Sequence, residues 1–159
     1  MTGLDTRQLK LEIVRPALQA IGLWSPSAEN LTTGTALAES RAVYLRQVGG
    51  GPAVGLWQME PVTHDDCWEN WLCAPGRSRQ ATALRQMIGY LSPSAGLMIG
   101  NLLYAAGMAR IRYQRIPAPL PGATDAAGLS QYHKAHYNTA KGAADPVANV
   151  AFFAEAIAA

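Results

Sequence analysis

The sequence predicts one all-α domain. Alanine, the strongest helix former, is abundant among the 159 residues, while valine and isoleucine are sparse. Apolar residues make up 49% of the chain and charged residues 15%, a balance that fills a core and argues against disorder. Apolar positions recur at helical three/four spacing, and no long stretch alternates as a strand would. Residues 1–159 are therefore expected to form a single domain.

The first two helices follow from apolar spacing and capping residues. Residues 5–22 carry one apolar face, formed by Leu11, Val14, Leu18 and Ile21. Pro16 is expected to kink this helix or to restart it. Ser25 and Pro26 then supply a serine cap followed by proline at the first helical position, which predicts a second helix over residues 26–45. The glycine run that follows must end this helix.

Further helices are bounded by proline, glycine or serine and are expected over residues 61–71, 78–91, 92–111, 124–137 and from 145 onward. Ser92 and Asp145 each precede a proline, which repeats the cap-then-proline arrangement of the second helix. The expected total is six or seven helices. A short β-hairpin over residues 46–57 stays open, because the glycines there permit tight turns.

The charge of the chain limits its partners. The formal net charge is +2, and no basic cluster is longer than Arg110-Ile-Arg112. Proteins that bind duplex nucleic acid usually carry a basic stripe, so we do not expect a nucleic-acid partner. A small positive charge does suit weak attraction to an anionic polymer.

Neither end of the chain predicts an export or membrane segment. Charged residues in MTGLDTRQLKLE occupy the place where a signal peptide needs its apolar run. The longest apolar tract, 147–159, is short and contains Asn149 and Glu155, so it is not expected to cross a bilayer. We expect no signal peptide and no membrane span.

Glu39 is the candidate catalytic residue. Its neighbours on the same helical face include no cation and are Thr35, Ala36, Ala42 and Val43. An acid on such a face loses water without gaining a partner, which favours the protonated form that a general acid needs. The alternative is an ordinary surface glutamate on a solvated face.

Further candidates lie in two segments after Glu39. Trp57, which follows the glycine-rich stretch GGGPAVG, offers a ring on which a sugar can stack, or it packs in the core; both interpretations stay open. Gln58 supplies an amide donor and an acceptor. Tyr137 and Asn138 end a predicted helix, where side chains can project over a groove, although Asn138 can also serve only as a helix terminator.

Metal ligation is the weaker interpretation of the histidines. His133 and His136 are three apart on one helical face, and the stretch THDDC adds His64, Asp65, Asp66 and Cys67. No HExxH or CxxC spacing accompanies these residues. His133 is expected on a solvated face, and neither a metal nor another cofactor is expected.

Three segments resemble the catalytic domain of lytic transglycosylases, in the goose-type lysozyme-like superfamily. Glu39-Ser40 is similar to the family's Glu-Ser pair at the end of a helix. Residues 55–63, GLWQMEPVT, resemble its Gly-Leu-x-Gln-hydrophobic-x-Pro-x-Thr segment. Gln58 lies 19 positions after Glu39, close to the family's spacing.

The third segment resembles the family's Ala-Tyr-Asn-x-Gly motif with two departures. Residues 136–139 read His-Tyr-Asn-Thr, so a histidine replaces the alanine, and the next glycine is Gly142. Residues 95–104, AGLMIGNLLY, resemble the helix between the second and third motifs. The likeness covers about residues 28–142.

The resemblance implies a lysozyme-like fold and peptidoglycan glycan strands as substrate. Glu39 would protonate the glycosidic oxygen between N-acetylmuramic acid and N-acetylglucosamine, and would then take the proton of the muramyl 6-hydroxyl as a 1,6-anhydro ring closes. Gln58, Tyr137 and Asn138 would orient the substrate, and Ser40 would support the site by hydrogen bonding.

The stretch GLWQMEPVTHDD resembles phage-encoded members of the family, and the expected absence of a signal peptide fits them as well. This resemblance implies a virion-associated protein or one made in the host cytoplasm, acting on the periplasmic wall. Other virion or tail proteins would then be further partners.

Two other functions stay open. A hydrolytic muramidase on the same fold would need a second carboxylate near Glu39, and Glu60, Asp65 and Asp66 are available. A phage structural protein could instead keep the fold as a wall-binding module without turnover, which the altered third motif would suit.

Overall fold

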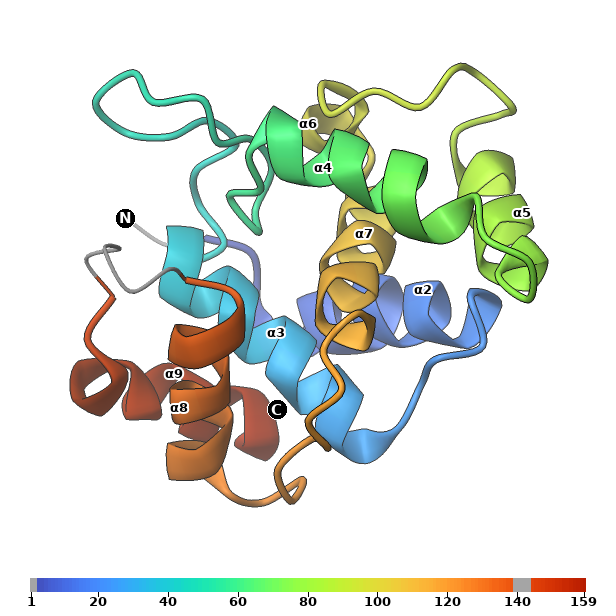
Figure 1. The fold of residues 1–159 in the computed structure, drawn as a ribbon. Coiled ribbons are helices and arrows are strands. Elements are labelled where there is room, and N and C mark those ends of the chain that lie inside the picture. The colour runs from blue at the N-terminus through green and yellow to red at the C-terminus, as the bar shows by residue number, and fades with distance from the viewer. Residues whose placement is uncertain (1–2, 139–143) are drawn as a thin grey trace.

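Helix α3, Pro26–Ser40, runs through the centre of the fold in the computed structural model, which describes residues 3–138 and 144–159 (Figure 1). On one side of α3 lie α8, Ala126–His136, and α9, Pro146–Ala158, which pack on α3 and on each other. Helix α7, Leu102–Gln114, also contacts α3. The all-α fold class that the sequence predicts is confirmed.

The other helical segments complete the fold around this centre. They are α1 (Thr6–Gln8), the π-helical η1 (Leu9–Val14), α2 (Arg15–Ala20), α4 (Pro61–Cys67), the π-helical η2 (Trp68–Leu72), α5 (Ser78–Met87) and α6 (Leu97–Gly100). Figure 1 shows α4, α5 and α6 on the side of α3 opposite α8 and α9. Within the described residues, no helix has the length and apolar character needed to cross a bilayer.

Of the kink or restart expected at Pro16, the structure shows a restart: a π-helical turn ends at Val14, and α2 begins at Arg15 with Pro16 in its first turn. The segments α1, η1 and α2 follow one another without a break, and the Arg15 N–H donates to the carbonyl of Lys10 in a π-helical turn. The Lys10 ammonium is buried and donates to the carbonyl of Ala156 at 2.7 Å. The N-terminal helix is thereby fixed to the last turn of α9.

Arg15 and Glu29 connect α2 to α3. The Arg15 guanidinium donates two hydrogen bonds of 2.8 Å to the two carboxylate oxygens of Glu29, and the Trp24 indole N–H donates to the same group. Burial works to raise the pKa of Glu29, but the bonds from Arg15 and Trp24 outweigh it, so the pKa lies below its usual value. A depressed folded-state pKa gives stability that is present above the unfolded-state pKa and is lost as the pH falls through the folded-state pKa.

Arg15→Met is expected to lower the melting temperature at neutral pH, because the buried Glu29 carboxylate then keeps only one of its two partners. The difference from the wild type should shrink as the pH falls through the acid range and Glu29 becomes protonated. Thermal unfolding followed by circular dichroism at several pH values measures this. The matched control is Arg7→Met, at an exposed position of the same helical run. A difference that stays constant at every pH would contradict this account.

Helix α3 ends five residues before the predicted Leu45, a difference that places Glu39 in its last turn. Arg41 and Ala42 adopt positive φ angles of 54° and 53°, a left-handed conformation that stops the helix. The Ser40 hydroxyl donates to the carbonyl of Leu56 at 2.7 Å. The end of α3 is therefore bound to the segment that carries the second motif.

The segment between α3 and α4 contains no regular strand among its described residues. Two isolated antiparallel bridges join Arg46 to Val54 and Val54 to Met59. The hairpin that stayed open over residues 46–57 is thus reduced to single bridges between turns. Farther along, the helix expected over 92–111 begins only at Leu97, so Ser92 does not cap it. It is also divided at Asn101, whose side chain caps α7 by accepting from the Tyr104 N–H at 3.0 Å.

Gly34 allows α9 to pack closely on α3. A Cβ at this position would lie 2.3 Å from Cδ1 of Phe153, a fully buried ring of α9. We expect Gly34→Ala to destabilise the fold by about 1–3 kcal/mol through overpacking, despite the better helix propensity of alanine. Denaturant unfolding measures the change. The same substitution should cost less in a Phe153→Leu background, where the ring is gone; a stabilising Gly34→Ala would refute the close contact.

Candidate functional site

A groove of about 770 Å³ lies between the end of α3, the segment that follows it and the C-terminal helices. Five of the six predicted site residues line this groove, namely Glu39, Ser40, Gln58, Tyr137 and Asn138. They come from three separate parts of the chain, which the fold brings together. The sixth predicted residue, Trp57, does not line the groove in the described part of the chain.

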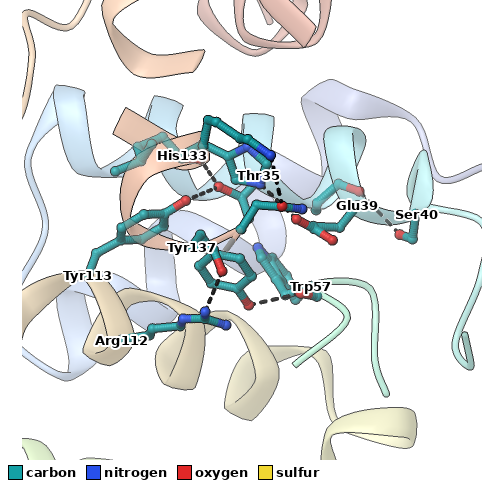
Figure 2. A network of polar contacts seen from close by, with 12 residues as sticks. Thr35, Glu39, Ser40, Trp57, Arg112, Tyr113, His133 and Tyr137 are labelled. Atoms are coloured by element: carbon teal, nitrogen blue, oxygen red, sulfur yellow. Dashed lines mark hydrogen bonds and ion pairs between the residues drawn. The ribbon is translucent and has the colours of Figure 1, made fainter. Parts of the chain in front are cut away.

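Glu39 faces the groove and has a partner. Its side chain is 16% exposed, and its Oε1 lies 2.7 Å from Nε2 of His133 on α8 (Figure 2). The expectation that Glu39 has no partner is therefore wrong. The prediction considered only neighbours within α3, whereas His133 reaches Glu39 from a helix that packs across it.

His133 is buried, so the expectation that it lies on a solvated face is wrong. Only 1% of it is exposed. Its ring stacks on Tyr137, with a distance of 5.9 Å between the ring centroids and an interplanar angle of 23°. The ring of Phe153 also packs against it, with the two centroids 5.7 Å apart. Its Nδ1 is buried and has no hydrogen-bond partner among the described residues.

Tyr137 joins the third motif to the second. Its hydroxyl donates to the carbonyl of Trp57 at 2.8 Å (Figure 2). Burial raises the pKa of Tyr137 well above its usual value, so the phenol keeps its proton and remains a donor. The Arg112 guanidinium lies over the ring, 4.2 Å from its centroid, and donates to the Tyr137 carbonyl. Tyr137 thus fixes one wall of the groove, with only 3% of its own surface exposed.

Trp57 belongs to the core, so its prediction as a sugar-stacking residue is wrong. It is 1% exposed, and its indole N–H donates to the carbonyl of Thr32 in α3 at 2.8 Å. A ring in this position has no face left for a ligand. Of the two interpretations that the sequence left open for Trp57, packing in the core is the correct one.

Ser40 and Gln58 shape the groove through backbone contacts. Ser40 is 2% exposed, and its hydroxyl binds the Leu56 carbonyl, so it supports the site rather than offering a hydroxyl to a ligand. Gln58 has a positive φ of 45° and donates from Nε2 to the carbonyls of Gly55 at 2.8 Å and Tyr44 at 3.3 Å. These bonds hold the Gln58 side chain at the edge of the groove.

The end of α8 carries Asn138. Its N–H donates to the carbonyl of His133 at 3.0 Å, and its Oδ1 accepts from Lys134 at 3.4 Å. Asn138 therefore both ends the helix and lines the groove. Thr139 and Gly142, the remaining positions of the third motif, lie outside the described residues.

One of the three candidate second carboxylates lies on the groove. Glu60 is exposed and lines the same groove as Glu39. Asp65 lies 2.8 Å from the His64 ring, and Asp66 pairs with Arg115 at 2.6 Å; neither lines the groove. Of the three, Glu60 therefore remains a candidate for a second acid. Asp145 also lines the groove, where its Oδ1 accepts from the Val147 N–H as the cap of α9.

The histidines make protein contacts. His64 is fully buried, with its Nε2 2.6 Å from the Tyr104 hydroxyl, and His136 packs edge-on against Tyr132. In the described ranges, no three histidine, cysteine or acidic side chains are grouped closely enough to hold a metal ion.

Sequence reasoning missed three residues of the site. Arg112 and Tyr44 line the groove, and Tyr44 is 41% exposed, which makes it the aromatic ring available to a ligand. His133 was noted only for its spacing from His136. It precedes Tyr137 by one helical turn, a spacing that places both side chains on one face of α8 and could have indicated their contact.

No protein-family model, curated protein or solved structure matches this chain. The groove geometry and the residues of the three motifs are therefore what bears on its function.

Proposed function

We propose that this domain is a lytic transglycosylase, which cleaves the β-1,4 bond between N-acetylmuramic acid and N-acetylglucosamine in peptidoglycan. The observation that carries the proposal is the placement of Glu39, a largely shielded carboxyl group on the wall of a groove of about 770 Å³. That volume lies within the range of small-molecule sites.

Glu39 serves as acid and then as base. Protonated Glu39 gives its proton to the glycosidic oxygen, and the bond from that oxygen to C1 of the muramyl residue breaks. The muramyl 6-hydroxyl then forms a bond to C1, and its proton passes to the Glu39 carboxylate. Each cycle returns Glu39 to its protonated starting state. The reaction therefore consumes no water and requires no second carboxylate.

The other groove residues would position the sugar chain. Gln58 and Asn138 offer amide groups at the edge of the groove, and Tyr44 offers an exposed ring against which a sugar can pack. Ser40 and Tyr137 act through the backbone carbonyls of Leu56 and Trp57, which keep the segment carrying Gln58 in place.

The likeness of GLWQMEPVTHDD to phage-encoded members supports a phage origin within this proposal. A virion component that opens the wall at entry and an enzyme that opens it at lysis would both use this site. The cell wall is the place of action in either case.

A hydrolytic muramidase is the second candidate, because Glu60 lines the same groove as Glu39. In that reaction a carboxylate activates water, which attacks C1 in place of the 6-hydroxyl. Glu60→Gln distinguishes the two reactions. A transglycosylase should keep its rate in this variant, whereas a hydrolase that uses Glu60 should lose it.

Incubation of purified peptidoglycan with the protein tests the proposal as a whole. We expect soluble muropeptides to accumulate with time in the presence of the wild type and to be absent with Glu39→Gln. Protein that pellets with the peptidoglycan but releases no fragments would instead be a wall-binding module, and the proposal would fail.

A further inference from the structure

We propose that His133 is a positioning residue that binds Oε1 of Glu39 through Nε2–H and so reserves Oε2 for the proton that reaches the substrate. This role rests on the function proposed for Glu39. His133 itself does not line the groove and is 1% exposed, so it acts through Glu39 rather than on the sugar.

The surroundings of the ring determine its tautomer. A neutral imidazole carries one N–H and one acceptor nitrogen. Nδ1 is buried without a hydrogen-bond partner among the described residues, whereas Nε2 lies 2.7 Å from Oε1 of Glu39. Buried donors that lack an acceptor are rarer in proteins than buried acceptors that lack a donor. The N–H therefore belongs on Nε2, where the Glu39 oxygen accepts it.

Packing prevents the ring from turning away. Tyr137 stacks on one side of His133, and Phe153 contacts it from α9 (Figure 2 shows the Tyr137 side). Tyr137 is itself fixed by its bond to the Trp57 carbonyl. Phe153 is held against Gly34 of α3, where no Cβ intervenes. The orientation of the imidazole, and with it the direction of its N–H, is thus set by three helices and the second motif.

The same hydrogen bond is compatible with both states of Glu39. When Oε2 carries the proton, Oε1 is the carbonyl oxygen and accepts from Nε2–H. When Glu39 is a carboxylate, Oε1 still accepts, and the bond is charge-assisted. His133 keeps its own proton throughout the cycle. The His133 donor on Oε1 also restrains the carboxyl group from rotating, so the acidic proton on Oε2 faces the groove.

Two measurements test this role. Long-range proton–nitrogen NMR of the three histidines, assigned with His64→Gln and His136→Gln, reports which nitrogen of His133 carries the proton. We expect Nε2–H in the wild type, and a loss of this fixed tautomer in Glu39→Ala. Peptidoglycan cleavage by His133→Met should show kcat reduced about 10- to 100-fold with little change in KM, because the acid is misdirected while substrate contacts remain.

His133→Gln is the matched control, since its amide N–H can replace Nε2–H. It should recover most of the kcat that His133→Met loses, which a role in packing alone would not predict. A wild-type His133 with its proton on Nδ1, or a His133→Met protein that folds and cleaves at the wild-type rate, would overturn the positioning role and leave the proposed function standing. Absence of cleavage by the wild type would overturn both, whatever tautomer the NMR shows.

Discussion

Glu39→Gln is expected to reduce peptidoglycan cleavage by about a thousandfold or more, because general acid–base catalysis contributes about a hundred- to ten-thousandfold and one group serves both steps here. A glutamine at this position is nearly isosteric, and its carbonyl oxygen can still accept from His133. It cannot give a proton to the glycosidic oxygen or take one from the 6-hydroxyl. The rate of fragment release from purified peptidoglycan measures the loss.

The fold should survive this substitution. Glu39 is at the surface of the groove and its bond to His133 can be retained, so the melting temperature should stay near that of the wild type. Glu60→Gln is the matched control, since it removes an acid from the same groove at an exposed position. Comparable activity of Glu39→Gln and the wild type would remove Glu39 from the mechanism.

Trp57→Ala is expected to lower the free energy of unfolding by about 3–5 kcal/mol, the range for removing a large aromatic side chain from a core. The ring is 1% exposed, and its loss would also leave the Thr32 carbonyl without its donor. Trp57→Phe keeps most of the packing and should cost about 1–2 kcal/mol through the lost hydrogen bond and the smaller ring. Denaturant unfolding of both variants measures these changes.

Tyr44 provides the comparison for Trp57. Because Tyr44 is 41% exposed on the groove, Tyr44→Ala should change stability by less than about 0.5 kcal/mol while weakening the binding of glycan fragments. Trp57→Phe should instead lower the stability of the fold and leave the binding of glycan fragments unchanged. A stable Trp57→Phe protein that binds glycan poorly would contradict the core position of Trp57.

The helices were predictable where local signals dominate. Ser25 and Asp145 cap α3 and α9 through their side chains, as their positions before proline predict. The C-terminal end of α3 was not predictable in the same way. The residues after Ser40 favour helix locally, and the chain turns there because Ser40 binds the distant Leu56 carbonyl and Arg41 adopts a left-handed conformation.

The candidate site was predictable as a set of motifs but not as a set of contacts. The order of the three segments predicted Glu39, Gln58 and Tyr137 as site residues, and all three line one groove. The contact of Glu39 with His133 spans 94 positions in the chain, so no periodicity within α3 could reveal it. The burial of Trp57 depends equally on where α3 crosses the second motif.

The mass of the muropeptides released from purified peptidoglycan tests the central claim most directly. If Glu39 alone acts as acid and base, the muramyl ends carry a 1,6-anhydro ring and each product is one water lighter than its hydrolytic counterpart. Products that end in free reducing muramic acid would contradict this account and would assign the second step to water activated by another carboxylate.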